Sequence, residues 1–461
     1  MRRLRFLIIF LLSQLAIRCD GGSIPSNSLN PPNSPPSSTL STDLGGGYNE
    51  DLSHIDNALL VRSGVKWVRG FVNIPRNFLV FGDLCTVGGS CPVIGVLGSN
   101  ISQDPDPDSG DSEVLAISAF NNLIQATNAM TPGGQAVKII LSLKTDFKYK
   151  NMGVPDVNSP AMTYLLSAIE QLLENNGAGG HIDILVLGNE PMFETPLDDP
   201  INLKDPVTSA EMYGKFLNLL IDRLQVLKQK NAWRYEIFTG ALNKAYGLRN
   251  DKTYGPILQT ILQVTQARSE VSGIDLHLHV ESISEAEGDV NFVRTTLGTG
   301  KKIISTEFSL VGLWNLHSKE TLQSPGSNGC PADKKLFEWI NDLQTQATAG
   351  HPTSQADFLK CFSAQSWYPP HRFSLFMDLF NNPSYNVFAA TYGLHSSPTI
   401  PPQLYNDSST LWYLNFVYNC TLLGRDENGS CKTNPLVFPD FENAIDEMSP
   451  GGPKAVKPPL Q

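Results

Sequence analysis

Two short apolar segments of this sequence each run directly into a glutamate. The first reads Ile-Leu-Val-Leu-Gly-Asn-Glu-Pro over residues 184–191, and the second reads Ile-Ile-Ser-Thr-Glu-Phe-Ser over residues 303–309. A short apolar run bounded by turn signals indicates a strand buried on both faces, as in a parallel sheet. In an eightfold β/α barrel the C-terminal ends of the strands form the active site. We therefore expect Glu190 and Glu307 to lie at the same end of one barrel.

Helix and strand patterns alternate from about residue 48 onward, which predicts parallel β/α units. Strands are expected at 40–47, 65–71, 137–143, 182–187, 235–240, 274–280, 302–306 and 373–380. Helices are expected at 49–62, 113–129, 159–173, 208–229, 256–267, 288–297, 336–343 and 410–422, the fourth starting with a capping box of Thr208 and Glu211. This order predicts the α/β class and a (β/α)8 TIM barrel, one catalytic domain over residues 47–431.

The segments outside this domain have other compositions. In residues 1–19, Arg2, Arg3 and Arg5 precede the apolar run Phe6–Ile17, as in a secretory signal, and the run is shorter than the ~20 residues of a membrane span. Residues 20–46 are rich in Ser, Pro, Asn and Gly and predict a disordered spacer. Residues 432–461 form a Pro/Gly-rich tail. We expect a secreted, extracellular and soluble monomer.

Charge and cysteine content agree with export. The formal net charge of −11 argues against nucleic acid and anionic membranes as partners. Six cysteines remain after the signal and allow fifteen disulfide connectivities, of which the pairing closest in sequence is Cys85–Cys91, Cys330–Cys361 and Cys420–Cys431. The sequons at Asn100, Asn406, Asn419 and Asn428 predict glycosylation. The stretch 76–112, which holds the first cysteine pair, is expected to be a long loop on the catalytic side.

The positions of the motifs suggest a family. With the strands counted as above, Gly64–Arg69 lies in the second, Gly188–Pro191 ends the fourth and Ser305–Phe308 ends the seventh. This layout resembles glycoside hydrolase clan A, the retaining (β/α)8 glycosidases, and is most similar to its cellulase-like family five. The similarity of pattern covers roughly residues 48–425, although only these short motifs match closely.

The resemblance implies roles for four residues. Glu190 would be the acid/base, Glu307 the nucleophile and Arg69 the support of the nucleophile, while Asn189 would bind the sugar 2-hydroxyl. Arg69 should lower the pKa of Glu307, and the negative charge of Glu307 should raise that of Glu190. The alternatives are a helix-starting surface carboxylate for Glu190 and structural ion pairing for Glu307 and Arg69.

The expected sixth strand carries two histidines. Period-two alternation puts Asp275, His277 and His279 on one side of that strand. The clan often has His-X-Tyr here, so His277 fits, whereas His279 stands where a tyrosine would donate to the nucleophile. Two such histidines could also bind a metal, but no clustered partner residue is evident, and we expect no metal or other cofactor. Lys144 ends the third strand, where many relatives have a histidine; it could contact substrate or a carboxylate, or be a solvated loop lysine.

Aromatic side chains near the motifs are candidates for stacking on sugar rings. Trp314 and Trp367 are the candidates, and Trp367 would be the clan's tryptophan of strand eight if that strand began earlier than expected. Phe193 and Glu194 follow the predicted acid/base and could line the cleft or pack at its rim. Trp67 lies within a strand, so we assign it to the core.

Taken together, these features predict a secreted retaining β-glycosidase that cleaves a cell-wall polysaccharide, with an endo preference, through a glycosyl-enzyme intermediate. The substrate partner would be a polysaccharide or oligosaccharide. Two alternatives remain open: a transglycosylase using the same intermediate, and a catalytically inactive carbohydrate-binding wall protein on the same barrel.

Overall fold

The structure, a computed structural model, contains eight parallel strands that close into a barrel. It describes residues 42–48, 64–82, 91–96, 120–129, 134–197, 205–323, 330–351, 364–368 and 372–393, with isolated positions between them. The barrel strands are β1 (Asp43–Gly47), β2 (Trp67–Asn73), β5 (Lys138–Lys144), β6 (Ile184–Leu187), β7 (Glu236–Asn243), β8 (Val271–His279), β9 (Lys302–Ser309) and β10 (Val387–Gly393). They pair in sequence order, and β10 closes the barrel on β1. The predicted (β/α)8 TIM barrel is confirmed.

Seven of the eight predicted strands are present. The barrel begins at Asp43, inside the segment that composition alone assigned to the spacer. Strands β7 and β9 extend three residues beyond their predicted ends, to Asn243 and Ser309. These extensions matter because they bring further polar side chains to the catalytic end of the barrel.

The predicted eighth strand, residues 373–380, is wrong. Those residues belong to helix α13 (Arg372–Phe380), which buries Phe376, Met377, Leu379 and Phe380. Their spacing of one, three and four residues is that of one helix face. The last strand is β10, which is buried at six of its seven positions. Residues 373–380 and 387–393 are both rich in apolar residues, so only the spacing of these residues distinguishes the helix from the strand.

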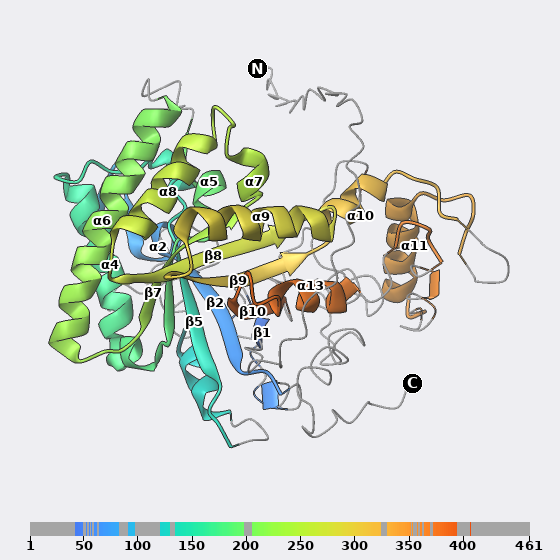
Figure 1. Ribbon diagram of the computed structural model, residues 1–461, viewed down its shortest axis with the longest axis horizontal. Helices are drawn as coiled ribbons and strands as arrows, with labels where there is room; N and C mark the ends of the chain where they lie inside the picture. The colour runs from blue at the N-terminus through green and yellow to red at the C-terminus, as the bar shows by residue number, and fades with distance from the viewer. Residues whose placement is uncertain are drawn as a thin grey trace, which may run out of the picture. The chain divides into compact units, whose positions relative to one another are not determined.

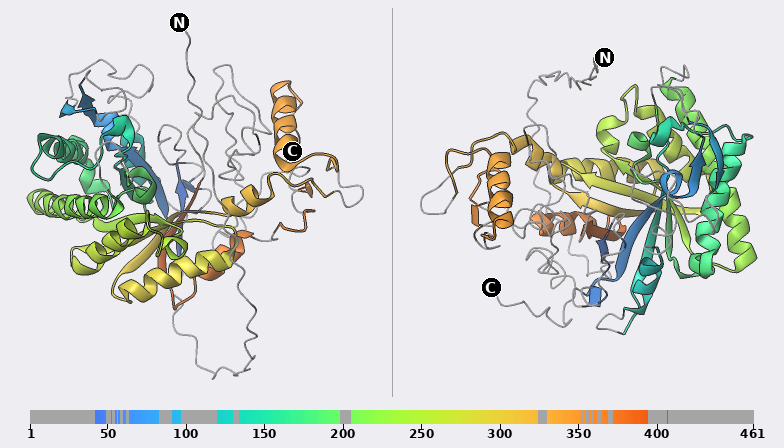
Figure 2. Two further views of the ribbon diagram at one scale, coloured as in Figure 1. Left: turned by 90° about the horizontal axis from the view of Figure 1, so that it is seen from above. Right: turned by 180° about the vertical axis from the view of Figure 1, so that it is seen from behind.

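The helices are α2 (Ile74–Phe78), α4 (Pro160–Glu174), α5 (Pro191–Glu194), α6 (Pro206–Asn231), α7 (Ala245–Leu248), α8 (Gly255–Ala267), α9 (Ile283–Leu297), α10 (Val311–His317), α11 (Leu336–Thr348) and α13. Short 3-10 turns occupy Ala126–Asn128, Tyr149–Asn151 and Asn175–His181. Helices α4, α6, α8 and α9 lie along the outside of the barrel (Figures 1 and 2). The predicted helices at 49–62 and 410–422 lie largely or wholly outside the described residues.

Helix starts follow local capping chemistry. Ser159 caps α4 as predicted, its hydroxyl accepting from the Met162 amide. The capping box predicted for Thr208 and Glu211 is wrong: α6 starts earlier, and Asp205 accepts from the amides of residues 207 and 208 with Pro206 in the first turn. Helix α9 also starts earlier than expected, because Ser282 caps it.

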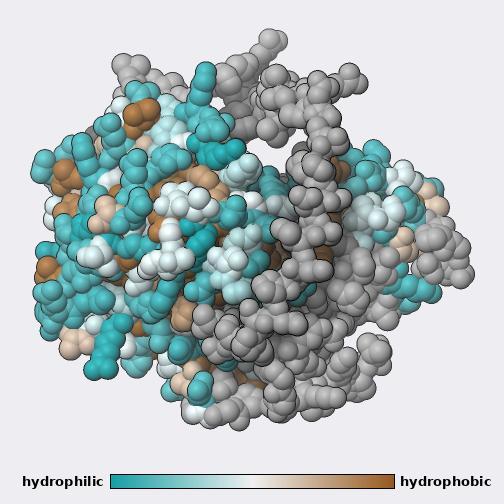
Figure 3. Space-filling view, in the orientation of Figure 1, coloured by the Kyte–Doolittle hydropathy of each residue, from teal (hydrophilic) through white to brown (hydrophobic). Residues whose placement is uncertain are grey.

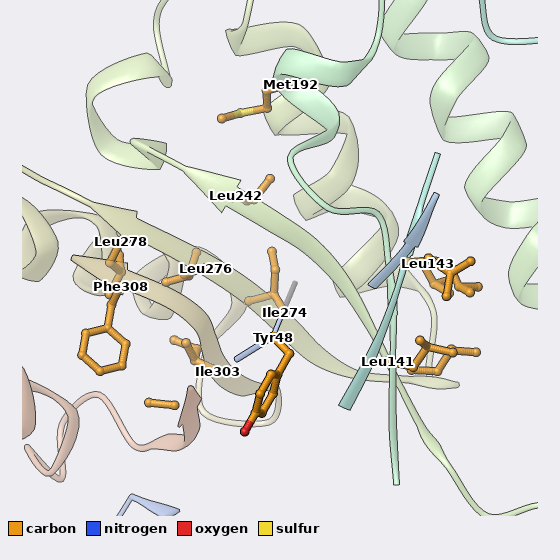
Figure 4. Close-up of a cluster of buried hydrophobic side chains, with 14 of the residues drawn as sticks. Tyr48, Leu141, Leu143, Met192, Leu242, Ile274, Leu276, Leu278, Ile303 and Phe308 are labelled. Atoms are coloured by element: carbon orange, nitrogen blue, oxygen red, sulfur yellow. The ribbon is translucent and has the colours of Figure 1, made fainter. Parts of the chain in front are cut away.

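The core has two parts. A small cluster from six strands fills the barrel interior, and it consists of Trp67, Ile140, Ile184, Val186, Phe238, Ile304 and Ala389. The core role assigned to Trp67 is therefore confirmed. A much larger cluster lies between the barrel and its helices, and Figure 4 shows part of it, including Leu276 and Leu278 of β8 with Phe308 of β9. Hydrophilic side chains cover most of the described surface in Figure 3.

The described parts of the segment after β2 form regular structure. The predicted long loop contains part of α2 and a two-stranded antiparallel sheet of β3 (Leu79–Phe81) and β4 (Val93–Val96). Cys91, just before β4, is disulfide-bonded to a partner outside the described residues, so its predicted pairing with Cys85 stays a prediction.

The predicted Cys330–Cys361 disulfide is present, with a Cα–Cα distance of 5.3 Å. It ties the start of the α11 segment to the chain that follows the helix. The pair Cys420–Cys431 lies outside the described residues. Within the described part of the chain, no helix combines the length and apolarity that crossing a bilayer requires.

A buried arginine binds the backbone just before each of the last two strands. Arg294 of α9 is 8% exposed. Its guanidinium donates to the carbonyl oxygens of Gly298 and Lys301, before β9, and to those of Tyr385 and Asn386, before β10. One side chain therefore satisfies four backbone acceptors.

We expect Arg294→Lys to lower the free energy of unfolding by ~1–3 kcal/mol, because one ammonium group cannot reach all four carbonyls and some of these partly buried acceptors lose their donor. Chemical denaturation measures this. The matched control is Arg223→Lys, which alters an exposed ion pair with Glu170 and should change stability by less than ~1 kcal/mol. Equal effects of the two substitutions would contradict this account of Arg294.

Candidate active site

The chain bends sharply where β6 delivers Glu190. Gly188 has φ +118°, and a Cβ there would lie 2.2 Å from the Gly240 carbonyl oxygen, so only glycine fits. Glu190 itself adopts φ +119° just before α5. A non-glycine residue in this region is strained, and such strain is concentrated at functional sites. The backbone is thus shaped to present the Glu190 carboxyl.

The second predicted carboxylate contacts the predicted arginine. Nη1 of Arg69 lies 2.6 Å from Oε1 of Glu307. Nη2 of the same guanidinium donates to Oδ1 of Asn189 at 2.6 Å, and its Nε donates to Ser142 at 3.3 Å. Arg69 is fully buried. It therefore connects the carboxylate of β9 to the residue that precedes Glu190.

His279 occupies the place where the resemblance led us to expect a tyrosine. Its Nε2 lies 3.1 Å from Oε2 of Glu307, and its Nδ1 lies 2.8 Å from Oγ of Ser309. An imidazole N–H can donate to a carboxylate as a phenol does. The histidine thus contacts the carboxylate that the missing tyrosine would have contacted.

His277 lies between the two carboxylates. Its Nδ1 is 3.2 Å from Oε1 of Glu190, and its Nε2 is 3.7 Å from Oε1 of Glu307. The ring is buried, whereas the Glu190 and Glu307 side chains keep 20% and 11% of their surface exposed. Both carboxyl groups therefore keep some accessible surface, while the imidazole has almost none.

The pKa values agree with the prediction for Glu307 but not for Glu190. Burial raises the pKa of Glu307, but the charges of His277 and Arg69 outweigh it and hold the pKa well below its usual range. The predicted rise for Glu190 is wrong. Burial and the charge of Glu307 raise the pKa of Glu190, but the hydrogen bond and charge of His277 outweigh them, so the pKa is lowered. The same carboxylates raise the pKa of His277 against the effect of its burial.

Asn243, which contacts Glu190, was missed by reasoning from the sequence. Its Nδ2 donates to Oε1 of Glu190 at 3.0 Å, while its buried Oδ1 has no hydrogen-bond partner within the described structure. Strand β7 was expected to end at Gly240, so Asn243 was counted as a loop residue. Its position three residues past a predicted strand was the available signal.

Glu194 and Lys144 form a second layer behind Asn189. Nδ2 of Asn189 donates to Oε1 of Glu194 at 3.0 Å, and Nζ of Lys144 lies 3.4 Å from the same oxygen. Both amide atoms of Asn189 are thus engaged by protein groups, so its predicted bond to a sugar hydroxyl would be shared with Glu194. Burial raises the pKa of Glu194 to about 7.

The predicted aromatic platforms lie on α10 and after α11. Trp314 is 2% exposed and packs against Trp367 and Tyr368, so no ring face is open to a sugar. Trp367 stacks on His317, with ring centroids 4.5 Å apart. The suggestion that Trp367 lies on strand eight is wrong, because β10 starts at Val387. Phe193 meets Tyr254 edge to face.

Three side chains could in principle hold a metal ion. They are Glu190, His277 and His279, and one possible ligand atom of each lies within 4.8 Å of those of the other two. However, all four ring nitrogens of the two histidines already have partners: Glu190, Thr306, Glu307 and Ser309. A metal would have to break these hydrogen bonds, so the residues fit a hydrogen-bonded acid/base cluster better than a metal centre.

No family model matches the sequence, and no curated protein is significantly similar to it. Among solved structures, an endo-β1,6-glucanase is 13% identical with a TM-score of 0.36, the match covering 60% of each chain. A conserved exported protein from Bacteroides fragilis is 9% identical with a TM-score of 0.43 over 88% of this chain and 83% of its own. The enzyme GH5_18 from Bifidobacterium longum, in complex with Manβ1-4GlcNAc, is 10% identical with a TM-score of 0.41, and the match covers 89% of this chain and 79% of that enzyme. The fold itself rests on the strand order described above.

The raised pKa of Glu194 predicts a pH-dependent stability. The folded state binds this proton more tightly than the unfolded state, whose pKa is ~4.3. Its contribution is therefore largest below ~4.3 and is lost as the pH rises through about 7. We expect Glu194→Gln to reduce the fall in Tm between about pH 5 and 8, as measured by calorimetry. The exposed Glu211→Gln is the control and should keep the wild-type slope; the same slope for Glu194→Gln would contradict the burial argument.

Proposed function

We propose that this protein is a secreted retaining β-glycosidase that hydrolyses a polysaccharide. One observation carries the proposal: the ring of His277 contacts Glu190 with Nδ1 at 3.2 Å and approaches Glu307 with Nε2 at 3.7 Å. Two partly exposed carboxyl groups, from the fourth and seventh strands of one barrel, therefore border the same space. Retaining glycoside hydrolysis uses such a pair.

The charges suit the two groups to different roles. Glu307, kept ionised by Arg69 and His277, would attack the anomeric carbon and form a covalent glycosyl-enzyme. Glu190, with His277 and Asn243 bonded to Oε1, would give a proton to the leaving oxygen and then accept one from water. Arg69 and His279 would hold Glu307 in line for attack.

The other candidate functions differ in what they require of this site. A carbohydrate-binding protein without activity would need neither an ionised nucleophile nor a partnered acid/base, so the intact pair favours an enzyme. Transglycosylation uses the same groups, with a second sugar in place of water. A cell-wall polysaccharide as substrate and an extracellular location remain parts of the proposal, and the Cys330–Cys361 disulfide agrees with export.

The stereochemistry of the product tests the mechanism. We expect the carboxyl groups to work at the ~5–5.5 Å separation of retaining enzymes, so the first product should be the β-anomer. A screen of β-linked polysaccharides for new reducing ends identifies a substrate, and proton NMR of the early reaction then reports the anomer. Initial release of the α-anomer would mean inversion and a wider spacing of ~6.5–9.5 Å.

Substitution of each carboxylate tests the roles. Glu307→Gln should abolish turnover while binding persists, because an amide of similar volume cannot form the intermediate. Glu190→Gln should slow substrates with poor leaving groups by ~100-fold or more but spare activated aryl glycosides, since only the former need the proton. Added azide should rescue the Glu190 variant by attacking the intermediate without a base.

The control is Glu281→Gln, which changes an exposed carboxyl just after β8 and should leave all rates unchanged. Equal losses on both kinds of substrate, with no rescue of either variant by azide, would contradict the assigned roles.

A further inference from the structure

A line of buried hydrogen bonds leads away from His277 on the side opposite Glu190. Nε2 of His277 lies 3.1 Å from Oγ1 of Thr306, and the Thr306 hydroxyl donates to Oδ2 of Asp275 at 2.5 Å. The Thr306 amide donates to the other oxygen, Oδ1, at 2.9 Å. All three side chains are 0–1% exposed. Asp275 and Thr306 therefore face the ring and each other rather than the substrate space.

With Asp275 ionised, the number of hydrogens on these groups fixes the direction of each bond. A threonine hydroxyl carries one hydrogen, and Thr306 gives it to Asp275 in the shorter of its two contacts. Its oxygen can then only accept from His277, so the Nε2 nitrogen must carry a proton. The ring's exchangeable proton is consequently on Nδ1, which faces Oε1 of Glu190 at 3.2 Å.

We propose that Asp275 and Thr306 are positioning residues that keep one proton on Nε2 of His277, so that the ring and Glu190 share the catalytic proton along the Nδ1–Oε1 line. This inference rests on the proposed function for its catalytic consequence, whereas the protonation of the ring is a property of the free protein. In this proposal His277 does more than contact the acid/base: it carries the proton that Glu190 uses.

The proton balance closes over one turnover. In the first half-reaction, the Nδ1–H bond breaks, the Glu190 carboxyl takes up the proton and hands it to the glycosidic oxygen, and the bond from carbon to that oxygen breaks as Glu307 bonds to the carbon. In the second, water attacks that carbon, the bond to Glu307 breaks, and Glu190 passes the proton of the water back to Nδ1. No proton has to leave the site.

Several charged groups among the described residues face or surround His277. Glu190 from β6, Glu307 from β9 and Asp275 from its own strand are negative neighbours that favour a cationic ring. Arg69 and His279 contact Glu307, and the His279 ring also meets the His277 ring edge to face, with centroids 5.8 Å apart. Of the three carboxyl groups near the ring in the described structure, only that of Asp275 is fully buried, which suits it to a fixed supporting role.

The direct test is the protonation of the ring in the free protein. The full chain is labelled with 15N-histidine, and the His277 signals are assigned among the eight histidines by their loss in His277→Gln. We expect Nε2 to stay protonated at every pH and Nδ1 alone to titrate. In Thr306→Val, which lacks the acceptor, the neutral ring should become a mixture of tautomers. Thr306→Ser should restore the wild-type signals.

A kinetic arm tests the consequence for catalysis. Thr306→Val should lower kcat/KM by ~10–100-fold for poor leaving groups and much less for activated aryl glycosides, and Thr306→Ser should recover most of the loss. The matched control is Thr239→Val. Thr239 is also a fully buried strand threonine, but its hydroxyl contacts that of Thr265 in α8. In Thr239→Val the His277 signals and the rates should therefore match those of the wild type.

Each outcome has a distinct meaning. An unprotonated Nε2 in the wild type would mean that Asp275 holds the proton and the chain of donors runs the other way, which overturns the inference. An unchanged tautomer in Thr306→Val overturns it as well. If no glycoside is cleaved by the wild type, the proposed function fails, yet the NMR result still decides the protonation of His277.

Discussion

The buried guanidinium of Arg69 is the interaction on which the rest of the site depends. It is fully buried, and a charge removed from water must be compensated by partners close at hand. Its donors reach Glu307 on β9, Asn189 after β6 and Ser142 on β5. Loss of one partner of such a pair typically costs ~3–5 kcal/mol. Stability therefore favours the same arrangement of strand ends that the proposed chemistry requires.

Much of this site follows from the sequence because strands impose simple rules. An apolar run that stops at a carboxylate located Glu190 and Glu307, and period-two alternation grouped Asp275, His277 and His279 correctly. Gly188 is equally constrained, since any side chain would meet the Gly240 carbonyl. These features follow from backbone geometry, which can be predicted well from a single sequence.

The features that could not be predicted depend on where strands begin and end and on distances between side chains. Asn243 joined the site because β7 continues past Gly240, and strand ends are poorly marked in sequence. The eighth strand was misplaced because Phe373–Phe380 is as apolar as β10. The pKa of Glu190 was predicted to rise from the charge of Glu307, but whether His277 lies near enough to reverse that shift is decided by a contact of 3.2 Å.

The nearness of His277 to both carboxylates couples their charges during the proposed reaction. In the free protein the negative charge of Glu307, 3.7 Å from Nε2, is the strongest electrostatic cause of the raised pKa of His277. When Glu307 forms an ester with the sugar, that charge disappears, and the ring holds its proton less tightly as the leaving oxygen needs one. When water releases Glu307, the charge returns and the ring regains its affinity for the proton that Glu190 takes from water. In this proposed cycle the lowered pKa of Glu190 belongs to the resting state, because the proton that the acid would need lies on His277, one hydrogen bond away.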